Sequence, residues 1–368
     1  MTRGVAILGS TGSIGQSTLR VLGRHPDRFR VVALTALTSS GLLEQQAADA
    51  HASLARTVTT AGADCLIEAA THPEVDIVVN AVVGAAGLPA TLAALRAGKR
   101  VALANKETLV MAGALVMCAA QDGGGEIVPV DSEHSAVLQC VTQSPAGALR
   151  RIVLTASGGP FRDWAPARLA GASVDDALKH PTWRMGPKIT VDSATLANKA
   201  LEVIEAHHLF GLGYDDLDVV VHPQSIVHAL VEFVDGSVLS QLGFPNMELP
   251  ILYALTHPER LPDTGVTRFD PVGAGLLTFE PVRRADFPAL ALGVGAGRAG
   301  GTAPAVFNAA NEMAVQAFLD RRLPFGRIAG VIEETLAAHT VTPGDSLEAI
   351  LEADRWARLE STRQCSNS

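Results

Sequence analysis

Two acidic motifs in this sequence have the residue types that bind a divalent metal ion. The first lies in VPVDSEHSAV, where Asp131 and Glu133 directly follow a short apolar run. Side chains two residues apart in an extended segment share a face, so we expect both carboxylates to project together from the end of a buried strand. The alternative is that Asp131 or Ser132 caps a following helix.

A third acid, Glu202, lies further along the chain in VDSATLANKALEVIEAHHLF. This stretch has helical spacing, and Asp192 and Ser193 are its expected N-cap residues. The same period places Asn198, Lys199 and Glu202 on one face. Three carboxylates suit a hard ion such as Mg²⁺ or Mn²⁺ rather than zinc. The alternative is a solvated helix on which Glu202 only pairs with Lys199.

Other polar residues could bind a phosphate group. TASGGPF places Ser157 and two glycines in a turn after a strand, where hydroxyl and backbone N–H groups can face an anion. Ser193, Asn198 and Lys199 would add donors and one positive charge. Together these residues suit a monophosphate, although each alone is more typical of an ordinary turn or cap.

A segment between two prolines, HPTWRMGP, has the composition of a loop that closes over a ligand. It contains His180, Trp183 and Met185. A surface loop with a packed tryptophan is the alternative. Asn311 and Glu312, in NAANE, are expected to serve packing or capping.

A glycine-rich segment near the N-terminus predicts a dinucleotide site. VAILGSTGSIGQSTLRVL places Gly9, Gly12 and Gly15 between a strand and a helix, where a diphosphate can approach the backbone and the helix N-terminus. The spacing differs from the usual fingerprint, so the strand-turn-helix context carries the prediction.

The end of the second strand favours NADP over NAD. There VVALTALTSS lacks the acid that binds the ribose of NAD, and Thr38 and Ser39 would supply the polar contacts. A short-chain dehydrogenase would need a Tyr-x-x-x-Lys pair, which neither Tyr214 nor Tyr253 begins.

Composition excludes several classes of protein. A net charge of −9 over 368 residues, without a basic block, argues against a nucleic-acid-binding protein. Residues 77–95 carry no charge, but their internal glycines and proline favour a strand, a turn and a helix over a membrane span. Four cysteines without metal-ligand spacing, and no secretory signal, favour a reduced cytoplasmic protein.

The apolar runs predict an α/β protein. VAIL, RVVAL, DIVVNAVV, RVALA and EIVPV alternate with helical stretches, as in a Rossmann-like doubly wound parallel sheet. Strands then restart at LRRIVLTASGGPF, and Asp235 and Gly236 mark a hairpin, so the middle of the chain is α+β. Amphipathic helices follow a turn-rich segment and predict a C-terminal helical bundle. The expected parts are a Rossmann-like NADP-binding domain (1–130), a catalytic metal- and substrate-binding domain (131–256), a linker (257–282) and a C-terminal helical domain (283–368).

Taken together, these motifs resemble the 1-deoxy-D-xylulose 5-phosphate reductoisomerase family of the methylerythritol phosphate route to isoprenoids. The matching stretches are GSTGSIG, LANKETLV, PVDSEH, SGGPF, HPTWRMGPKITVDSATLANKALEVIEA, HPQSIVHALVEFVDGSV and NAANE. They run from residue 7 to about residue 312 in the family's order.

The resemblance implies roles for individual residues. The implied metal ligands are Asp131, Glu133 and Glu202, and the implied phosphate-binding residues are Ser157, Ser193, Asn198 and Lys199. The implied catalytic residues are Lys106, Glu133 and His180, with Ser132 also on the substrate and Trp183 and Met185 on the closing loop. The implied cofactor-binding residues are Thr11, Gly12, Ser13, Ile14, Leu37, Thr38, Ser39, Asn105, Glu107 and Gly186. Many members carry a glycine and a basic residue where this chain has Leu37 and Thr38, so the 2′-phosphate contacts differ here.

The family's activity implies a homodimeric enzyme that uses NADPH and Mg²⁺ or Mn²⁺ to rearrange and reduce a small phosphosugar, with no nucleic-acid or membrane partner. Two other functions are consistent with the same residues. One is a metal-independent NADP dehydrogenase of the homoserine or semialdehyde type, in which the carboxylates orient substrate amines. The other is a catalytically silent dinucleotide sensor, in which the polar residues are only caps and salt bridges.

Overall fold

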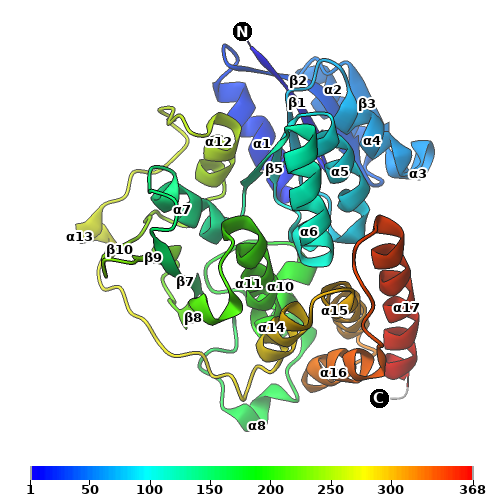
Figure 1. Ribbon diagram of the computed structural model, residues 1–368, viewed down its shortest axis with the longest axis vertical. Coiled ribbons are helices and arrows are strands. Elements are labelled where there is room, and N and C mark those ends of the chain that lie inside the picture. The colour runs from blue at the N-terminus through cyan, green and yellow to red at the C-terminus, as the bar shows by residue number, and fades with distance from the viewer. Residues whose placement is uncertain (1, 367–368) are drawn as a thin grey trace. The chain divides into compact units, whose positions relative to one another are not determined.

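The computed structural model describes residues 2–366, which form two compact units (Figure 1). The first unit consists of Met1–Thr108, Ala114–Thr142 and Asn246–Arg268. The second consists of Leu109–Gly113, Gln143–Pro245 and Phe269–Ser368.

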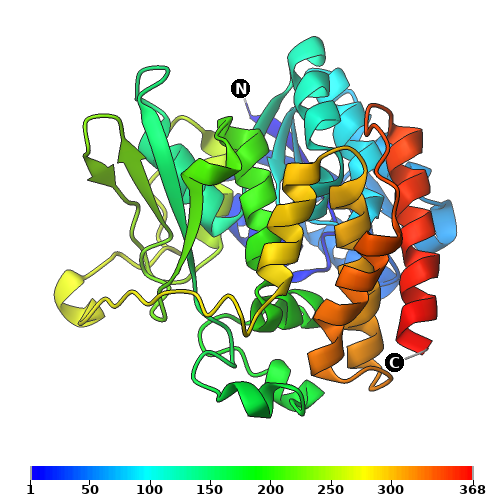
Figure 2. The ribbon, with the colours of Figure 1, turned by 60° about the horizontal axis from the view of Figure 1, so that its bottom comes forward.

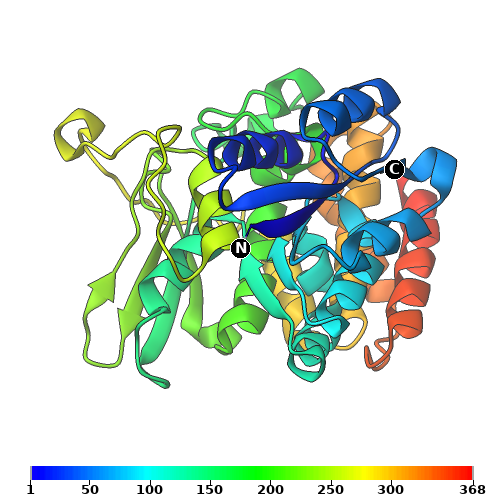
Figure 3. The same cartoon turned by 90° about the horizontal axis from the view of Figure 1, so that it is seen from above.

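A six-stranded parallel sheet forms the centre of the first unit. Its order is β3-β2-β1-β4-β5-β6, and β1 and β2 lie side by side in Figure 3. The strands are β1 (Arg3–Leu8), β2 (Phe29–Ala36), β3 (Leu54–Thr57), β4 (Ile77–Asn80), β5 (Arg100–Leu103) and β6 (Glu126–Pro129). This arrangement confirms the doubly wound sheet. The order reverses between β1 and β4, which is where such sheets bind ligands.

Helices connect these strands or pack against them. They are α1 (Ser13–Arg24), α2 (Ser40–Asp49), α3 (Val58–Ala61), α4 (Asp64–Thr71), η1 (Gly84–Gly87), α5 (Leu88–Arg96), α6 (Lys106–Gly123), α7 (Ser132–Val141) and α12 (Glu248–Thr256). Residues 77–95 form β4, η1 and α5, as expected. Within residues 2–366, no helix has both the length and the apolar character of a membrane span.

The expected domain boundaries differ from these units around α12. This helix packs on α1 and α7, and Glu248 and Asp263 both bind Arg24 of α1 at 2.7 Å. Residues 246–268 therefore belong with the parallel sheet rather than with a catalytic domain or a linker. Residues 131–142, which include α7, also belong to the first unit.

A four-stranded mixed sheet, ordered β10-β9-β7-β8, belongs to the second unit. Its strands are β7 (Leu149–Ala156), β8 (Leu217–Val221), β9 (Ala229–Phe233) and β10 (Val238–Leu239). Strand β7 pairs in parallel with β8 and antiparallel with β9, while β9 and β10 form the expected hairpin. Gly236 has φ +84° in the hairpin turn, a conformation that glycine adopts readily.

The remaining helices of the second unit are α8 (Pro166–Leu169), α9 (Val174–Ala177), α10 (Pro187–Thr195), α11 (Ala197–Phe210), η2 (Tyr214–Asp216), α13 (Pro271–Ala274), α14 (Ala289–Ala299), α15 (Ala303–Leu319), η3 (Phe325–Arg327), α16 (Ile328–Ala338) and α17 (Leu347–Ser366). Helices α14 to α17 confirm the C-terminal helical region (Figure 2). Because α14 packs on α11 and α15 packs on α10, these helices form one unit with the mixed sheet.

Candidate active site

The glycine loop between β1 and α1 is shaped by close backbone contacts. A Cβ at Gly9, which has φ +87°, would lie 2.7 Å from the carbonyl oxygen of Ala81. At Gly15 a Cβ would lie 2.4 Å from the carbonyl oxygen of Gly9. Gly12 is the N-cap of α1 and makes no side-chain cap hydrogen bond. The first N–H groups of α1 therefore have no side-chain cap, as a site for a diphosphate requires.

The predicted cofactor residues of the first unit lie at the carboxyl ends of its strands. Thr11 and Ile14 are half-buried, and Gly12 and Ser13 are exposed. After β2, the Leu37 side chain is 66% exposed, Thr38 is exposed, and the Ser39 side chain makes no cap hydrogen bond to α2. The Thr38 and Ser39 hydroxyl groups are therefore the polar groups that this strand end offers.

Asn105 joins two of these strand ends. Its side-chain oxygen accepts a hydrogen bond from the Thr108 N–H at the start of α6, and its amide donates to the carbonyl oxygens of Val82 and Gly84 at 2.6 and 2.9 Å. Glu107, also predicted to line the cofactor site, is buried in the same turn of α6. Asn105 thus fixes the loop after β4 to the loop after β5.

Lys106 and Asp131 form a short ion pair in the first unit. Lys106 follows β5 and Asp131 follows β6, and neighbouring parallel strands present their carboxyl ends at the same edge. Only 8% of Lys106 is exposed. The pair therefore places an ammonium group beside the acidic motif.

The expected extended geometry of Asp131 and Glu133 is wrong, because the chain turns into a helix at this point. Asp131 is the N-cap of α7, and its Oδ1 accepts a hydrogen bond from the Glu133 N–H at 3.2 Å. Glu133 lies in the first turn, next to Ser132. The two carboxylates still come together, with one oxygen of each within 4.8 Å of the other. Helix capping and cation binding are therefore compatible here.

The expected N-cap role of Asp192 and Ser193 is also wrong, because both residues lie inside α10. This helix runs from Pro187 to Thr195, its C-cap Leu196 has φ +61°, and α11 starts at Ala197. The sequence offers no glycine at this break. Asp192 instead binds Lys188 and Asn311, and the Lys-x-x-x-Asp spacing was the available signal for the first of these bonds.

The predicted polar face of α11 is present, and it is buried. The Asn198 amide donates to Glu202 Oε1 at 2.7 Å, and the Lys199 ammonium donates to Glu202 Oε2 at 2.5 Å. Lys199 also donates to the carbonyl oxygen of Thr155 at 2.6 Å. Lys199 is 3% exposed and Glu202 is 0% exposed, which excludes a solvated helix face. A carboxylate buried this fully requires compensating positive charge.

Ser157 and His180 are joined by a hydrogen bond of 2.9 Å. The N–H groups of Thr182 and Trp183 donate to His180 Nδ1, so the neutral ring carries its proton on Nε2 and donates to Ser157 Oγ. Ser157 Oγ also accepts from the Gly159 N–H at 3.2 Å. Its own hydroxyl proton therefore points to other partners, as a phosphate-binding serine requires. Burial lowers the pKa of His180 to about 4, so this arrangement holds at neutral pH.

The expected loop spans the residues between His180 and α10. Trp183 and Met185 are half-buried, and the Trp183 ring lies 6.5 Å from that of His228. Gly186 is exposed and is the N-cap of α10. The loop therefore leads directly into the helix that carries Ser193.

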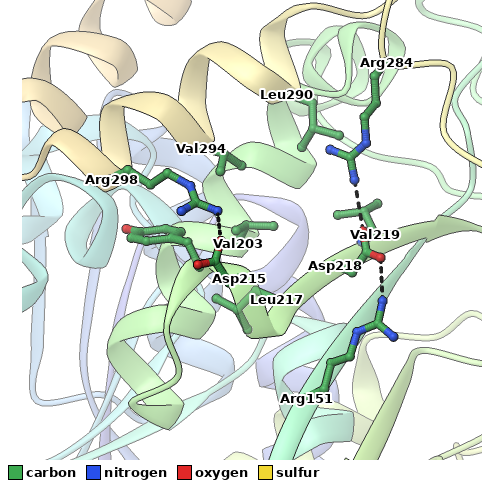
Figure 4. Close-up of a pocket in the computed structure, with 11 residues that line it drawn as sticks. Arg151, Val203, Asp215, Leu217, Asp218, Val219, Arg284, Leu290, Val294 and Arg298 are labelled. Carbon is green, nitrogen blue, oxygen red and sulfur yellow. Dashed lines mark hydrogen bonds and ion pairs between the residues drawn. The ribbon is translucent and has the colours of Figure 1, made fainter.

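A pocket of about 280 Å³ in the second unit contains none of the predicted site residues (Figure 4). In this pocket the Asp218 carboxylate lies between two guanidinium groups, as Figure 4 shows. It accepts hydrogen bonds from Arg151 Nη2 at 2.7 Å and from Arg284 Nη2 at 3.0 Å. A third arginine, Arg298, binds Asp215 at 2.6 Å. Each arginine in the pocket is thus already paired with an aspartate.

A parallel sheet in the order β3-β2-β1-β4-β5-β6, with a glycine loop after its first strand, places the chain in the class of dinucleotide-binding proteins. Three protein-family models match this chain. The model of 1-deoxy-D-xylulose 5-phosphate reductoisomerase matches residues 5–60 and 50–113, and the model of the 1-deoxy-D-xylulose 5-phosphate reductoisomerase C-terminal domain matches residues 127–210. A further model, the DXP reductoisomerase C-terminal domain, matches residues 242–360. The chain belongs to the 1-deoxy-D-xylulose 5-phosphate reductoisomerase family.

Individual relatives agree over almost the whole chain. The chain is 51% identical to the reductoisomerase of Heliobacterium modesticaldum, over 99% of this chain and 98% of that one. A solved structure of the Zymomonas mobilis enzyme in complex with NADPH covers 100% of both chains, with 41% identity and a TM-score of 0.92. A DOX-P reductoisomerase in complex with NADPH, fosmidomycin and magnesium has a TM-score of 0.93 and 42% identity, over 99% of this chain and 98% of that one.

Proposed function

We propose that this chain converts 1-deoxy-D-xylulose 5-phosphate to 2-C-methyl-D-erythritol 4-phosphate, by skeletal rearrangement followed by reduction with NADPH. It is an NADPH- and metal-dependent oxidoreductase of isoprenoid biosynthesis. The observation that carries the assignment at the residue level is the buried Asn198–Lys199–Glu202 group, which the family resemblance predicts and which a solvated helix would not form.

Asp131, Glu133 and Glu202 are the proposed ligands of Mg²⁺ or Mn²⁺. The donor set fits such an ion, because Asp131 and Glu133 present neighbouring oxygens and Glu202 is a fully buried carboxylate. The bound cation would polarise the adjacent carbonyl and hydroxyl oxygens of the ketose, which favours the rearrangement. Lys106, held by Asp131, is the proposed donor to a substrate oxygen, with Ser132 beside it.

Ser157, Ser193, Asn198 and Lys199 are the proposed phosphate-binding residues. Ser157 has its hydroxyl proton directed away from His180 and Gly159, and Lys199 supplies positive charge in a buried environment, where it acts strongly. Fixing the phosphate orients the reacting carbons at the other end of the molecule. Trp183 and Met185, on the loop before α10, would exclude water when the substrate is bound.

The glycine loop is the proposed diphosphate site of NADPH. Thr11, Gly12, Ser13 and Ile14 would bind the diphosphate, and Asn105, Glu107 and Gly186 would line the rest of the cofactor site. The cofactor supplies the hydride for the reduction step. Thr38 and Ser39 would contact the 2′-phosphate by hydrogen bonds, because residues 37–45 contain no lysine or arginine.

We also propose that the enzyme is a cytoplasmic homodimer. Val234, Val238 and Leu239 in and before β10 are 65%, 53% and 49% exposed, and Val272 in α13 and Leu276 just after it are 88% and 85% exposed. Apolar side chains this exposed on an edge hairpin and in the segment around α13 favour cover by a second copy. The free cysteines, including the exposed Cys118, suit a reducing compartment.

Oxidation of NADPH by the purified protein, measured by absorbance with 1-deoxy-D-xylulose 5-phosphate and Mg²⁺, tests the proposal. We expect turnover that EDTA abolishes and that added Mn²⁺ restores. Turnover that persists in EDTA would favour a metal-independent dehydrogenase. Binding of NADPH with no turnover under any of these conditions would favour a silent sensor.

A further inference from the structure

A buried aspartate in α10 connects this helix to the C-terminal region. Asp192 is 1% exposed, and its Oδ2 lies 2.8 Å from the Nζ of Lys188, one turn earlier in the same helix. Its Oδ1 accepts a hydrogen bond of 2.8 Å from the side-chain amide of Asn311 on α15. Asn311 is 0% exposed. This bond joins residues 119 positions apart in the sequence.

The buried carboxylate of Asp192 needs hydrogen-bond donors, and this need restricts the positions that α10 can take. A carboxylate in such a buried place is stable only where donors meet its oxygens. Lys188 can follow α10 if the helix moves, because both residues belong to it. Asn311 cannot, since it is fixed in the long buried helix α15, which packs against α16 and α17. The Asn311 amide therefore sets where α10 can lie within the second unit.

Helix α10 carries Ser193 and lies between two other segments assigned to substrate binding. Its first residue follows the loop of His180, Trp183 and Met185, and Ser193 follows Asp192 directly. At the far end only Leu196 separates α10 from α11, the helix of Asn198, Lys199 and Glu202. A displacement of Asp192 would thus be transmitted to Ser193 and to the start of α11.

We propose that Asn311 is a positioning residue for substrate binding: by binding Asp192 it holds α10 in the position that lets Ser193 meet the substrate phosphate. This inference rests on the proposed assignment of Ser193 to the phosphate. It assigns to Asn311 a role other than packing or capping, which the sequence alone suggested. Asn311 is fully buried and its amide donates to Asp192, so its effect would be transmitted through Asp192.

The chain offers a matched control on the same helix. Asn308 is also 0% exposed on α15, but its amide donates to Glu312 of α15 at 2.9 Å. Asn308→Ala therefore removes an amide of equal burial whose hydrogen bond stays within α15. We expect Asn311→Ala to raise the KM for 1-deoxy-D-xylulose 5-phosphate about tenfold with kcat within about threefold, since small misplacements of binding groups have effects of this size or larger. Asn308→Ala should change neither by more than about twofold.

An exchange of the two side chains tests whether the hydrogen bond between residues 192 and 311 is what positions α10. Asn311→Asp places two carboxylates at hydrogen-bonding distance and should raise KM more than Asn311→Ala does. The double variant Asp192→Asn/Asn311→Asp restores one amide and one carboxylate, and we expect KM to return to within about threefold of the wild-type value. A double variant no better than the single one would overturn the proposal.

Hydrogen exchange separates this inference from the phosphate assignment. Amides of residues 187–195 should exchange faster in Asn311→Ala than in Asn308→Ala, in the free enzyme. The Ser193→Ala variant shows how much KM rises when the proposed phosphate contact itself is lost. If Ser193→Ala raises KM while Asn311→Ala leaves it unchanged, the role of Asn311 is overturned and the phosphate assignment stands. If Ser193→Ala has no effect on KM, the phosphate assignment fails, and the positioning role fails with it.

Discussion

Glu202 combines two functions that a substitution can separate. It is the counterion of buried Lys199 and the proposed third ligand of the metal. We expect Glu202→Gln to lose roughly 100-fold or more in turnover, because several kcal/mol of charge stabilisation depend on the metal. Loss of the carboxylate beside the buried Lys199 ammonium should also lower the free energy of unfolding by about 3 kcal/mol. Enzyme assays with Mg²⁺ and urea denaturation measure the two effects.

The double variant Lys199→Met/Glu202→Gln is the control for stability. It removes the ammonium group together with the carboxylate, so part of the lost stability should return. Binding of Mn²⁺, followed by electron paramagnetic resonance, should stay weak in both variants. Wild-type Mn²⁺ affinity in Glu202→Gln would exclude Glu202 as a ligand.

His180 is neutral in the folded protein over the whole neutral range. Burial lowers its pKa from 6.5 to about 4. Above pH 6.5 the folded and unfolded chains are both unprotonated at this residue, so it adds no pH dependence. Between pH 6.5 and 4 the unfolded chain gains a proton that the folded chain does not, and stability falls as the pH drops.

Nuclear magnetic resonance of the imidazole tests this behaviour. The His180 ring signals should not titrate between pH 8 and pH 5, and they should report the Nε2–H tautomer throughout. The acid-side loss of stability should be smaller in His180→Gln than in the wild type. A His180 titration midpoint near 6.5 would contradict the assigned hydrogen bonds from Thr182 and Trp183.

At the scale of elements, the glycine loop allows a graded test. A methyl group at Gly15 would meet backbone atoms at 2.4 Å, whereas one at Gly12 would meet its nearest neighbour at 3.4 Å. Gly15→Ala should therefore displace the loop, cost about 1–3 kcal/mol of stability and weaken NADPH binding at least tenfold. Gly12→Ala should keep wild-type stability, because its new methyl group makes an ordinary contact.

Quenching of intrinsic fluorescence by NADPH gives the affinity, and thermal denaturation gives the stability. If Gly15→Ala bound NADPH as tightly as the wild type, the loop could not be the diphosphate site.

The elements that the sequence predicts well are those with a local signal. Apolar runs located β1, β2, β4, β5 and β6, while β3, with exposed Arg56 between short side chains, had no such run. The break at Leu196 could not be predicted, because a non-glycine residue with positive φ is held there by its surroundings. The start of α7 was ambiguous because an aspartate at this position suits both a helix cap and a cation ligand, and Asp131 is the N-cap of α7.

The same distinction applies to the site. Asn198, Lys199 and Glu202 are spaced for contact on any helix, so their pairing follows from the sequence. Their burial does not, since it depends on the fold of the second unit. The Asp192–Asn311 bond has no local signal either.

At the scale of the whole molecule, contacts between distant parts of the sequence decide which segments belong together. Arg24 binds both Glu248 and Asp263, residues more than 200 positions away, and Ile251, Leu252 and Leu255 of α12 join the apolar core of the parallel sheet, so residues 246–268 belong to the first unit. Composition and spacing gave no reason to expect these pairs, so the segment was expected to divide between a catalytic domain and a linker. Single-residue polarity is visible in a sequence, but the choice of partner is a property of the folded chain.

The proposed dimer depends on the apolar side chains of the β10 hairpin. Strand β10 is a short sheet edge with Val238 and Leu239 exposed, and a second copy could extend or cover it. We expect the wild type to sediment at twice the 38.3 kDa of one chain. Val238→Glu/Leu239→Glu should bury charge in such an interface and shift the protein to monomers at micromolar concentration. Leu359→Glu, on α17 and 75% exposed, is the matched control and should remain dimeric. If the variant with the charged hairpin stayed dimeric, the interface would lie elsewhere. Burying two glutamates between copies costs more free energy than an ordinary dimer interface supplies.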